Sequence, residues 1–101
     1  MQAKVLSPNF DFQQAIPGWS MNLERDTIAR EFIFTNFERA FEFMGLCAQY
    51  AEKIDHHPDW SNSWNKVNVR LSTHSMKTLT ELDILMAQAM NHFAQQVSLN
   101  T

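Results

Sequence analysis

Apolar and polar residues alternate most regularly over Val67–Thr73. The apolar positions are Val67, Val69 and Leu71, and the polar positions between them are Asn68, Arg70 and Ser72. A period of two places the two sets on opposite faces of a β-strand. The pattern therefore predicts a strand with one face on a hydrophobic core. Asp59–Ser63 comes shortly before it and is predicted to be its partner strand in a hairpin.

Two longer segments have apolar residues at helical spacing instead. The first begins with a capping-box pattern, in which Thr35 is followed by Glu38, and it is expected to end by about His57 because Pro58 disfavours helical geometry in the residue before it. It carries two apolar stripes, one of Phe37, Ala40, Phe41, Met44, Ala48 and Ala51, the other of Phe43, Cys47, Tyr50 and Ile54. The second helix follows Thr80, which with Asp83 has the pattern of an N-cap pair. Its apolar positions are Leu82, Leu85, Met86, Ala89, Met90, Phe93 and Val97.

The N-terminal third predicts shorter elements. Ser7-Pro8 has the pattern of a cap followed by proline at the first helical position, and this helix must end before Pro17-Gly18. Trp19–Leu23 and Thr27–Phe34 are predicted strands, although Arg30 interrupts the apolar face of the second. The order of elements is helix, two strands, helix, hairpin, helix. It favours an α+β fold in which helices cover one face of an antiparallel sheet.

Size and charge narrow the class of protein. The chain has 101 residues, which predicts a single domain over residues 1–101. Its formal charge of −3 and its lack of a Lys/Arg cluster argue against nucleic acid as a main partner. The single cysteine cannot form an internal disulfide. The first eight residues lack the apolar run of a signal peptide, and no apolar stretch is long enough for a membrane span. We expect a soluble cytoplasmic protein.

Three histidines are the candidates for chemistry. His56 and His57 are adjacent at the expected end of the long helix, and His74 follows the best strand. Histidine is the side chain that titrates near neutral pH without help. Glu52 lies four residues before His56, so a continuing helix would place the two on one face, where the carboxylate could orient the ring. Asp55 and Asp83 are further candidates for such support.

The pattern leaves three interpretations open. His-His-Pro could simply end the helix, with the imidazoles near its last carbonyl groups. Three histidines and a carboxylate could bind zinc, although adjacent histidines rarely point to one centre and the chain has no H-x-x-x-H or C-x-x-C pair. The third interpretation is acid–base catalysis. Cys47 lies within an apolar stripe of the helix and is expected to be a core residue rather than a nucleophile.

A family resemblance covers nearly all of the chain from about Ala15 onward. The segments that carry it are Glu52–Trp60, which reads EKIDHHPDW, then Trp64–Val67 and Leu71–His74, with Pro17–Trp19, Phe37–Phe41 and Leu82-Asp83 in support. Together they resemble the signature of the pterin-4a-carbinolamine dehydratases. The resemblance implies an antiparallel four-stranded sheet with three helices packed on one face, in agreement with the order of elements.

The resemblance also implies a reaction and a site. Members of this family are hydro-lyases that remove water from 4a-hydroxytetrahydropterin and give quinonoid dihydropterin, in the recycling of tetrahydrobiopterin. The catalytic and substrate-contacting imidazoles would be those of His56, His57 and His74. The other residues expected to contact the pterin are Glu52, Asp55, Ser72, Thr73, Ser75, Asp83 and Trp19. No metal or other cofactor is expected, because a general acid and a general base suffice.

Finer roles follow as hypotheses. We expect His56 and His74 to transfer the protons and His57 mainly to hold the pterin ring. Oligomerisation is expected because an exposed edge strand in so small a domain tends to be paired, and the resemblance implies a homodimer or homotetramer. The alternative function is that of a protein-binding, transcriptional dimerisation cofactor, for which Met86, Met90, Phe93 and Val97 could serve as the interface. We expect these four residues to be core or homo-oligomer contacts instead.

Overall fold

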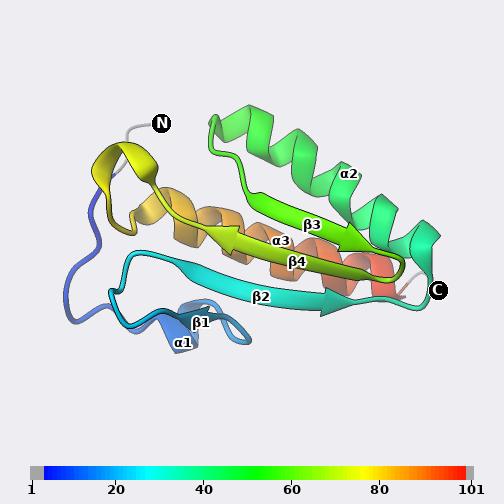
Figure 1. Ribbon diagram of the computed structural model, residues 1–101, viewed down its shortest axis with the longest axis horizontal. Helices are drawn as coiled ribbons and strands as arrows, with labels where there is room; N and C mark the ends of the chain where they lie inside the picture. Colours follow the sequence, from blue (N-terminus) through cyan, green and yellow to red (C-terminus); the bar gives the residue numbers. More distant parts are fainter. Residues whose placement is uncertain (1–3, 100–101) are drawn as a thin grey trace.

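Four antiparallel strands form one sheet in the order β1-β2-β4-β3 (Figure 1). The strands are β1 (Ser20–Met21), β2 (Ile28–Ile33), β3 (Asp59–Ser63) and β4 (Lys66–Leu71). The helices are α1 (Phe12–Ala15), α2 (Phe37–Ile54) and α3 (Glu81–Leu99), and a 3-10 turn, η1, spans His74–Met76. This computed structural model describes residues 4–99. Residues 1–3 lie outside that range, and they belong to the N-terminal segment that we expect not to be a signal peptide.

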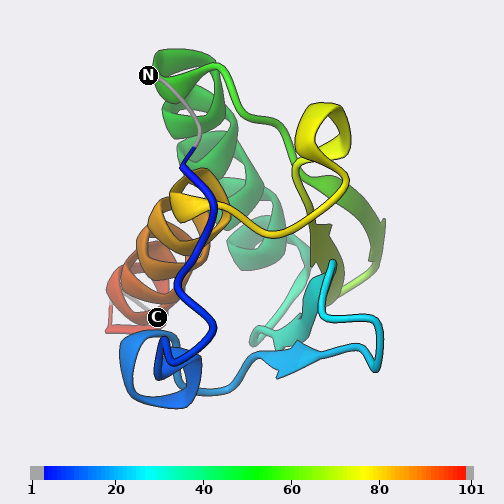
Figure 2. The ribbon, with the colours of Figure 1, turned by 90° about the vertical axis from the view of Figure 1, so that its left-hand side faces the viewer.

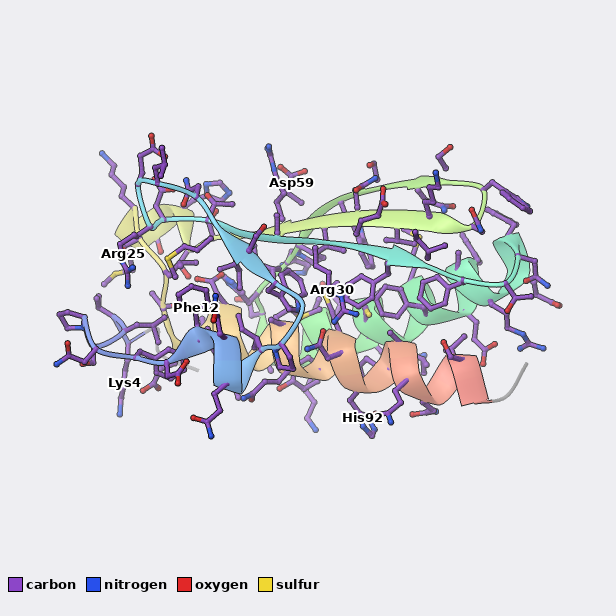
Figure 3. All side chains as sticks on the ribbon, turned by 90° about the horizontal axis from the view of Figure 1, so that it is seen from below. Lys4, Phe12, Arg25, Arg30, Asp59 and His92 are labelled. Atoms are coloured by element: carbon purple, nitrogen blue, oxygen red, sulfur yellow. The ribbon has the colours of Figure 1, made fainter. Side chains whose placement is uncertain are left out.

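The three helices lie on one face of the sheet, as expected (Figures 2 and 3). In the part of the chain that the structure describes, the opposite face carries no helix. Asp59 points away from the helices on that open face, whereas Arg30 lies between the strands and α3 (Figure 3). No helix among residues 4–99 is long and apolar enough to cross a membrane.

The hairpin is confirmed, and its alternation sets the two faces of the sheet. β3 pairs with β4 from Asp59 opposite Arg70 to Ser63 opposite Lys66. Val67, Val69 and Leu71 are buried against the helices, whereas Asn68 and Arg70 are exposed on the open face. Successive side chains of a strand point to opposite faces of the sheet, which explains this division. The sequence therefore predicts which side chains of β4 can form a site on the open face.

The apolar face of β2 is buried as predicted. Ile28, Phe32 and Phe34 belong to the core. Arg30 lies on the same face but is half-buried, and its guanidinium group stacks over the Phe32 ring with 4.4 Å from Cζ to the ring centroid. Its Nη1 donates to the Asn91 side-chain oxygen at 2.7 Å and to the Pro17 carbonyl at 3.2 Å. The interruption of the pattern is thus a polar contact between β2, the Pro17-Gly18 turn and α3.

The start of α2 differs from the predicted one. Its N-cap is Asn36, whose side chain accepts a hydrogen bond from the Arg39 amide, and not Thr35. The helix ends at Ile54, within the predicted limit of about His57, because Asp55 adopts a left-handed conformation with φ of 53° and closes the last turn. The stripe with Phe43, Cys47 and Ile54 faces the core, while members of the other stripe, Phe37 and Phe41 among them, are exposed.

Helix α3 confirms its predicted cap and core. The Thr80 amide donates to the Asp83 carboxylate and the Leu82 amide donates to the Thr80 hydroxyl. Met86, Met90 and Val97 are fully buried in the hydrophobic core, and Phe93 packs edge-on against Tyr50. Three of the four residues named for a partner interface are therefore core residues, as the sequence favoured.

The first helix begins later than predicted. Ser7 and Pro8 lie in a turn, in which Ser7 accepts hydrogen bonds from the amides of Asn9 and Phe10. α1 starts at Phe12, and its N-cap is Asp11, whose side chain accepts from the Gln14 amide. The Ser-Pro pattern was misleading because both serine and proline are as common in tight turns as at helix starts.

Candidate active site

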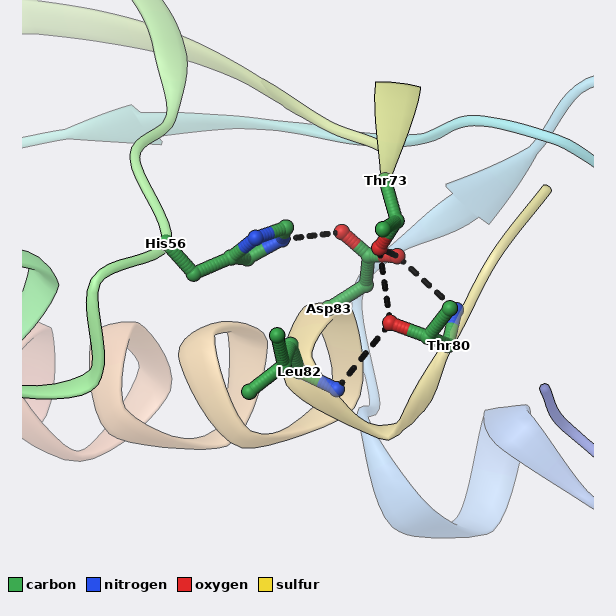
Figure 4. Close-up of polar contacts among 5 residues, drawn as sticks. All are labelled: His56, Thr73, Thr80, Leu82 and Asp83. Atoms are coloured by element: carbon green, nitrogen blue, oxygen red, sulfur yellow. Dashed lines mark hydrogen bonds and ion pairs between the residues drawn. The ribbon is translucent and has the colours of Figure 1, made fainter. Parts of the chain in front are cut away.

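Asp83 is a fully buried carboxylate at the start of α3, and it joins three elements (Figure 4). Its Oδ1 lies 2.6 Å from Nε2 of His56. Its Oδ2 accepts from the Thr73 hydroxyl at 2.8 Å and from the Thr80 amide at 2.9 Å. Both oxygens are thus occupied by donors, as a carboxylate out of contact with water requires.

The threonines extend this network. The Leu82 amide donates to the Thr80 hydroxyl at 3.3 Å, and the hydroxyls of Thr80 and Thr73 are 2.7 Å apart. Because Thr73 donates its proton to Asp83, the hydroxyl of Thr80 must donate to that of Thr73. Both residues are buried. The chain of hydrogen bonds fixes the segment after β4 on the first turn of α3, and so fixes the backbone that leads into His74.

The two adjacent histidines have different partners. His56 is buried on Asp83, with only 9% of its surface exposed. His57 is exposed, and its Nε2 lies 2.5 Å from the Glu52 carboxylate. The prediction that Glu52 orients His56 is therefore wrong. The physical reason is that the helix does not persist to His56: the left-handed residue Asp55 ends it and turns the chain so that the second histidine returns to Glu52.

A cavity of about 380 Å³ lies on the open face of the sheet. Both His57 and His74 line it, the first from the loop after α2 and the second from η1. Its floor is one row across the four strands, in which Ser20 pairs with Ala29, Ala29 with Arg70, and Arg70 with Asp59. The remaining lining residues are Met21, Asn22, Thr27 and Ser72. The small side chains of Ser20 and Ala29 leave the hollow between the charged and imidazole groups.

A second cavity of about 410 Å³ adjoins the first. The two share Thr27, Ser72 and His74 as lining residues. The second is otherwise lined by Asp26, Thr73, Lys77 and Thr78. His74 therefore stands between two hollows, Ser72 lines both, and Thr73 lines the second.

The other predicted contact residues lie elsewhere. Trp19 is 5% exposed, and its indole nitrogen donates to the Asn91 side chain at 2.8 Å, so it belongs to the core rather than to the rim of either cavity. Asp55 is the exposed cap of α2, and Ser75 is an exposed residue of η1; neither lines the two cavities. Asp83 and Glu52 reach the site through the histidines that they bind.

Sequence reasoning missed the polar residues of the cavity floor. Asp59 and Arg70 form an exposed ion pair with 3.3 Å between Oδ2 and Nη2, and Asn22 closes the β1–β2 turn by accepting from the amides of Asp26 and Thr27. The outward positions of the alternating β4 pattern could have indicated Arg70. The strand register that places Asp59 and Ala29 beside Arg70 could not be predicted from periodicity.

The donor set favours acid–base chemistry over metal binding. Among residues 4–99 there is no group of three or more His, Cys, Asp and Glu side chains placed to hold a metal ion. The two imidazoles on the cavity come from different elements, and one is held by a carboxylate. General acid–base catalysis requires titratable side chains at a cavity, and the two imidazoles meet that requirement. Fold and site thus define a small α+β protein with a histidine-lined cavity on the open face of its sheet.

Comparison with known proteins identifies the family. The sequence profile of the pterin 4 alpha carbinolamine dehydratase family matches residues 6–93. A Brucella ovis protein named "Putative pterin-4-alpha-carbinolamine dehydratase" is 51% identical over 81 residues, which are 80% of this chain and 84% of that protein. The chain belongs to the pterin-4α-carbinolamine dehydratase family.

Two solved structures share the fold. One is a crystal structure described as a transcriptional coactivator/pterin dehydratase from Brucella melitensis, with a TM-score of 0.84 and 45% identity over 90% of this chain and 99% of that one. The other is a pterin dehydratase-like protein described as a RuBisCO assembly factor in the alpha-carboxysome, with a TM-score of 0.67 and 17% identity over 79% of this chain and 93% of that one. The second likeness concerns the fold alone.

Proposed function

We propose that this protein dehydrates 4a-hydroxytetrahydropterin to quinonoid dihydropterin and so serves tetrahydrobiopterin recycling. The observation that carries the proposal is the cavity that His57 and His74 line from two elements, in a chain of this family. Its volume of about 380 Å³ lies within the range of typical small-molecule binding sites.

The reaction consists of two proton transfers and one bond cleavage. The C4a–O bond breaks, and the departing oxygen takes a proton from a general acid so that it leaves as water. The N5–H bond gives its proton to a general base, and its electron pair forms the C4a=N5 double bond. The sum is loss of one water with no change of oxidation state. Imidazole side chains suit both transfers, because histidine is the side chain best suited to act as acid or base at neutral pH, and each transfer is typically worth about 10²–10⁴-fold in rate.

The geometry favours His57 and His74 for these transfers. Both line the cavity, and the Glu52 carboxylate holds the imidazole of His57 in place. His56 is bound to Asp83 beneath the site and lines neither cavity. We therefore assign His56 to positioning the loop that carries His57, which differs from the division of roles expected from the sequence.

The test is dehydration of synthetic 4a-hydroxytetrahydropterin, followed by absorbance, by the wild-type protein and by single His→Gln variants. We expect His57→Gln and His74→Gln each to lower kcat by about 10²-fold or more. His92→Gln is the matched control, because this exposed histidine lies on α3, on the side that faces away from the sheet (Figure 3). A wild-type protein that gives no acceleration over buffer would exclude the proposed reaction.

We also propose that the protein is a cytoplasmic homo-oligomer. The exposed rings of Phe37 and Phe41 on α2 lie 5.7 Å apart, with 47% and 61% of their surfaces exposed. Adjacent exposed aromatic side chains of this kind mark contact surfaces between proteins. Light scattering should give a mass above that of one chain, and Phe41→Glu should lower it. A wild-type mass of 11.8 kDa would contradict this assignment.

A further inference from the structure

The second cavity continues the site beyond His74. It shares Thr27, Ser72 and His74 with the first, so the two cavities meet at these three residues. Its volume of about 410 Å³ matches that of the first. A flat bicyclic ring in one hollow leaves the other free for a substituent of that ring.

The chemistry of the ring indicates which substituent this is. In a pterin, N5 is bonded to both C4a and C6. Under the proposed function His74 acts at N5 or at the hydroxyl on C4a, so the C6 substituent leaves the ring within one to three bonds of the atom that His74 contacts. The second cavity begins at His74. It is therefore the nearest space for the C6 substituent.

The second cavity contains a cation without a carboxylate partner. Lys77 lines it, and no ion pair joins this residue to an acidic side chain among residues 4–99. The acidic residue that lines this cavity is Asp26, whose Oδ1 accepts hydrogen bonds from the Asn22 side-chain amide and the Thr27 hydroxyl within its own turn. In the first cavity, by contrast, Arg70 is paired with Asp59.

The backbone places Lys77 beside the histidine. It follows His74 by three positions, and its backbone amide donates to the His74 carbonyl at 3.2 Å to close the η1 turn. Lys77 is held at this point in a left-handed conformation, with φ of 54°, which is uncommon for a residue other than glycine.

We propose that the second cavity binds the C6 substituent of the pterin, and that Lys77 makes the enzyme prefer substituents that carry a negatively charged group, such as a carboxylate or a phosphate. The inference rests on the proposed dehydratase function. It adds to that function a preference among pterins, since a neutral substituent of equal size would fill the same space without an ion pair.

The experiment compares three synthetic 4a-hydroxytetrahydropterins, with a methyl group, a carboxyalkyl group or the carboxamide of equal length at C6. The ratio of kcat/KM for the carboxylate to that for the carboxamide measures the charge preference. We expect a ratio of about 2–5 in the wild-type protein, the range of an exposed ion pair, and a lower ratio at high salt. Lys77→Met should bring it to about 1, and Lys77→Arg should retain it.

Lys66→Met is the matched control, because Lys66 is an exposed lysine at the opposite end of β4 and should leave the ratio unchanged. The methyl compound distinguishes failure of the charge preference from failure of the dehydratase function. If it is dehydrated while the wild-type ratio is 1, or while Lys77→Met keeps the wild-type ratio, the preference is overturned and the dehydratase function stands. If it is not accelerated at all, the proposed function fails, and this inference fails with it.

Discussion

Replacement of Asp83 tests how the buried network supports the site. The carboxylate is fully buried and accepts three hydrogen bonds, from His56, Thr73 and Thr80. Asp83→Ala would leave the His56 ring and the Thr80 amide without a partner in a space closed to water. Asp83→Asn would keep the shape, and its amide could still donate to His56 while its oxygen accepts from the threonines.

The expected magnitudes follow from these contacts. Removing one partner from a buried hydrogen-bonded charge typically costs about 3–5 kcal/mol, and each buried donor left unpaired costs about 1–3 kcal/mol. For Asp83→Ala we therefore expect a loss of about 3–5 kcal/mol in the free energy of unfolding. For Asp83→Asn we expect about 1–2 kcal/mol, because the hydrogen bonds remain and only their charge-assisted part is lost.

Urea unfolding followed by tryptophan fluorescence measures both values. Asp59→Ala is the control, since its exposed ion pair with Arg70 should contribute no more than about 1 kcal/mol. A loss below 1 kcal/mol for Asp83→Ala would refute the reasoning, because it would mean that His56 and the threonines find other partners at little cost.

Three further predictions concern the fold around the site. Gly18→Ala should lower the free energy of unfolding by about 1–3 kcal/mol in the same urea assay, because Gly18 has φ of 90° and an added Cβ would lie 2.8 Å from Nη1 of Arg30; no loss would contradict it. Asn36→Ala should cost about 1 kcal/mol by removing the cap that receives the Arg39 amide, and an unchanged midpoint would count against that cap. Burial raises the pKa of the Cys47 thiol, so iodoacetamide should label this thiol only in urea, and rapid labelling of the native protein would disprove this. Above about pH 8.5 only the unfolded protein's thiol loses its proton, so the free energy of unfolding should fall as the pH rises past that value.

The sequence predicted what depends on local periodicity. The alternation of β4 identified its core face, and the period of α3 identified Met86 and Met90 as candidate core positions, because a regular element repeats the burial of one residue at a fixed spacing. The cap formed by Thr80 and Asp83 was also predictable, since its partners lie within one turn. These features need no knowledge of distant residues.

Asp83 was among the carboxylates that the sequence offered as support for His56, and that expectation is confirmed. Periodicity could not choose it over Glu52 and Asp55, because His56 binds Asp83 across 27 residues and this contact depends on how α2 and α3 pack. The pairing of His57 with Glu52 depends on one left-handed residue, Asp55, which redirects the chain. Adjacency in sequence therefore concealed that one histidine is buried while the other faces a cavity.

The most direct test of the account is the rate of dehydration of synthetic 4a-hydroxytetrahydropterin with and without the protein in one buffer. The account predicts an acceleration proportional to protein concentration, abolished in a folded His57→Gln/His74→Gln double variant and largely kept in a folded His56→Gln variant. A double variant that remains as active as the wild type, or a wild-type protein that gives no acceleration, would contradict it.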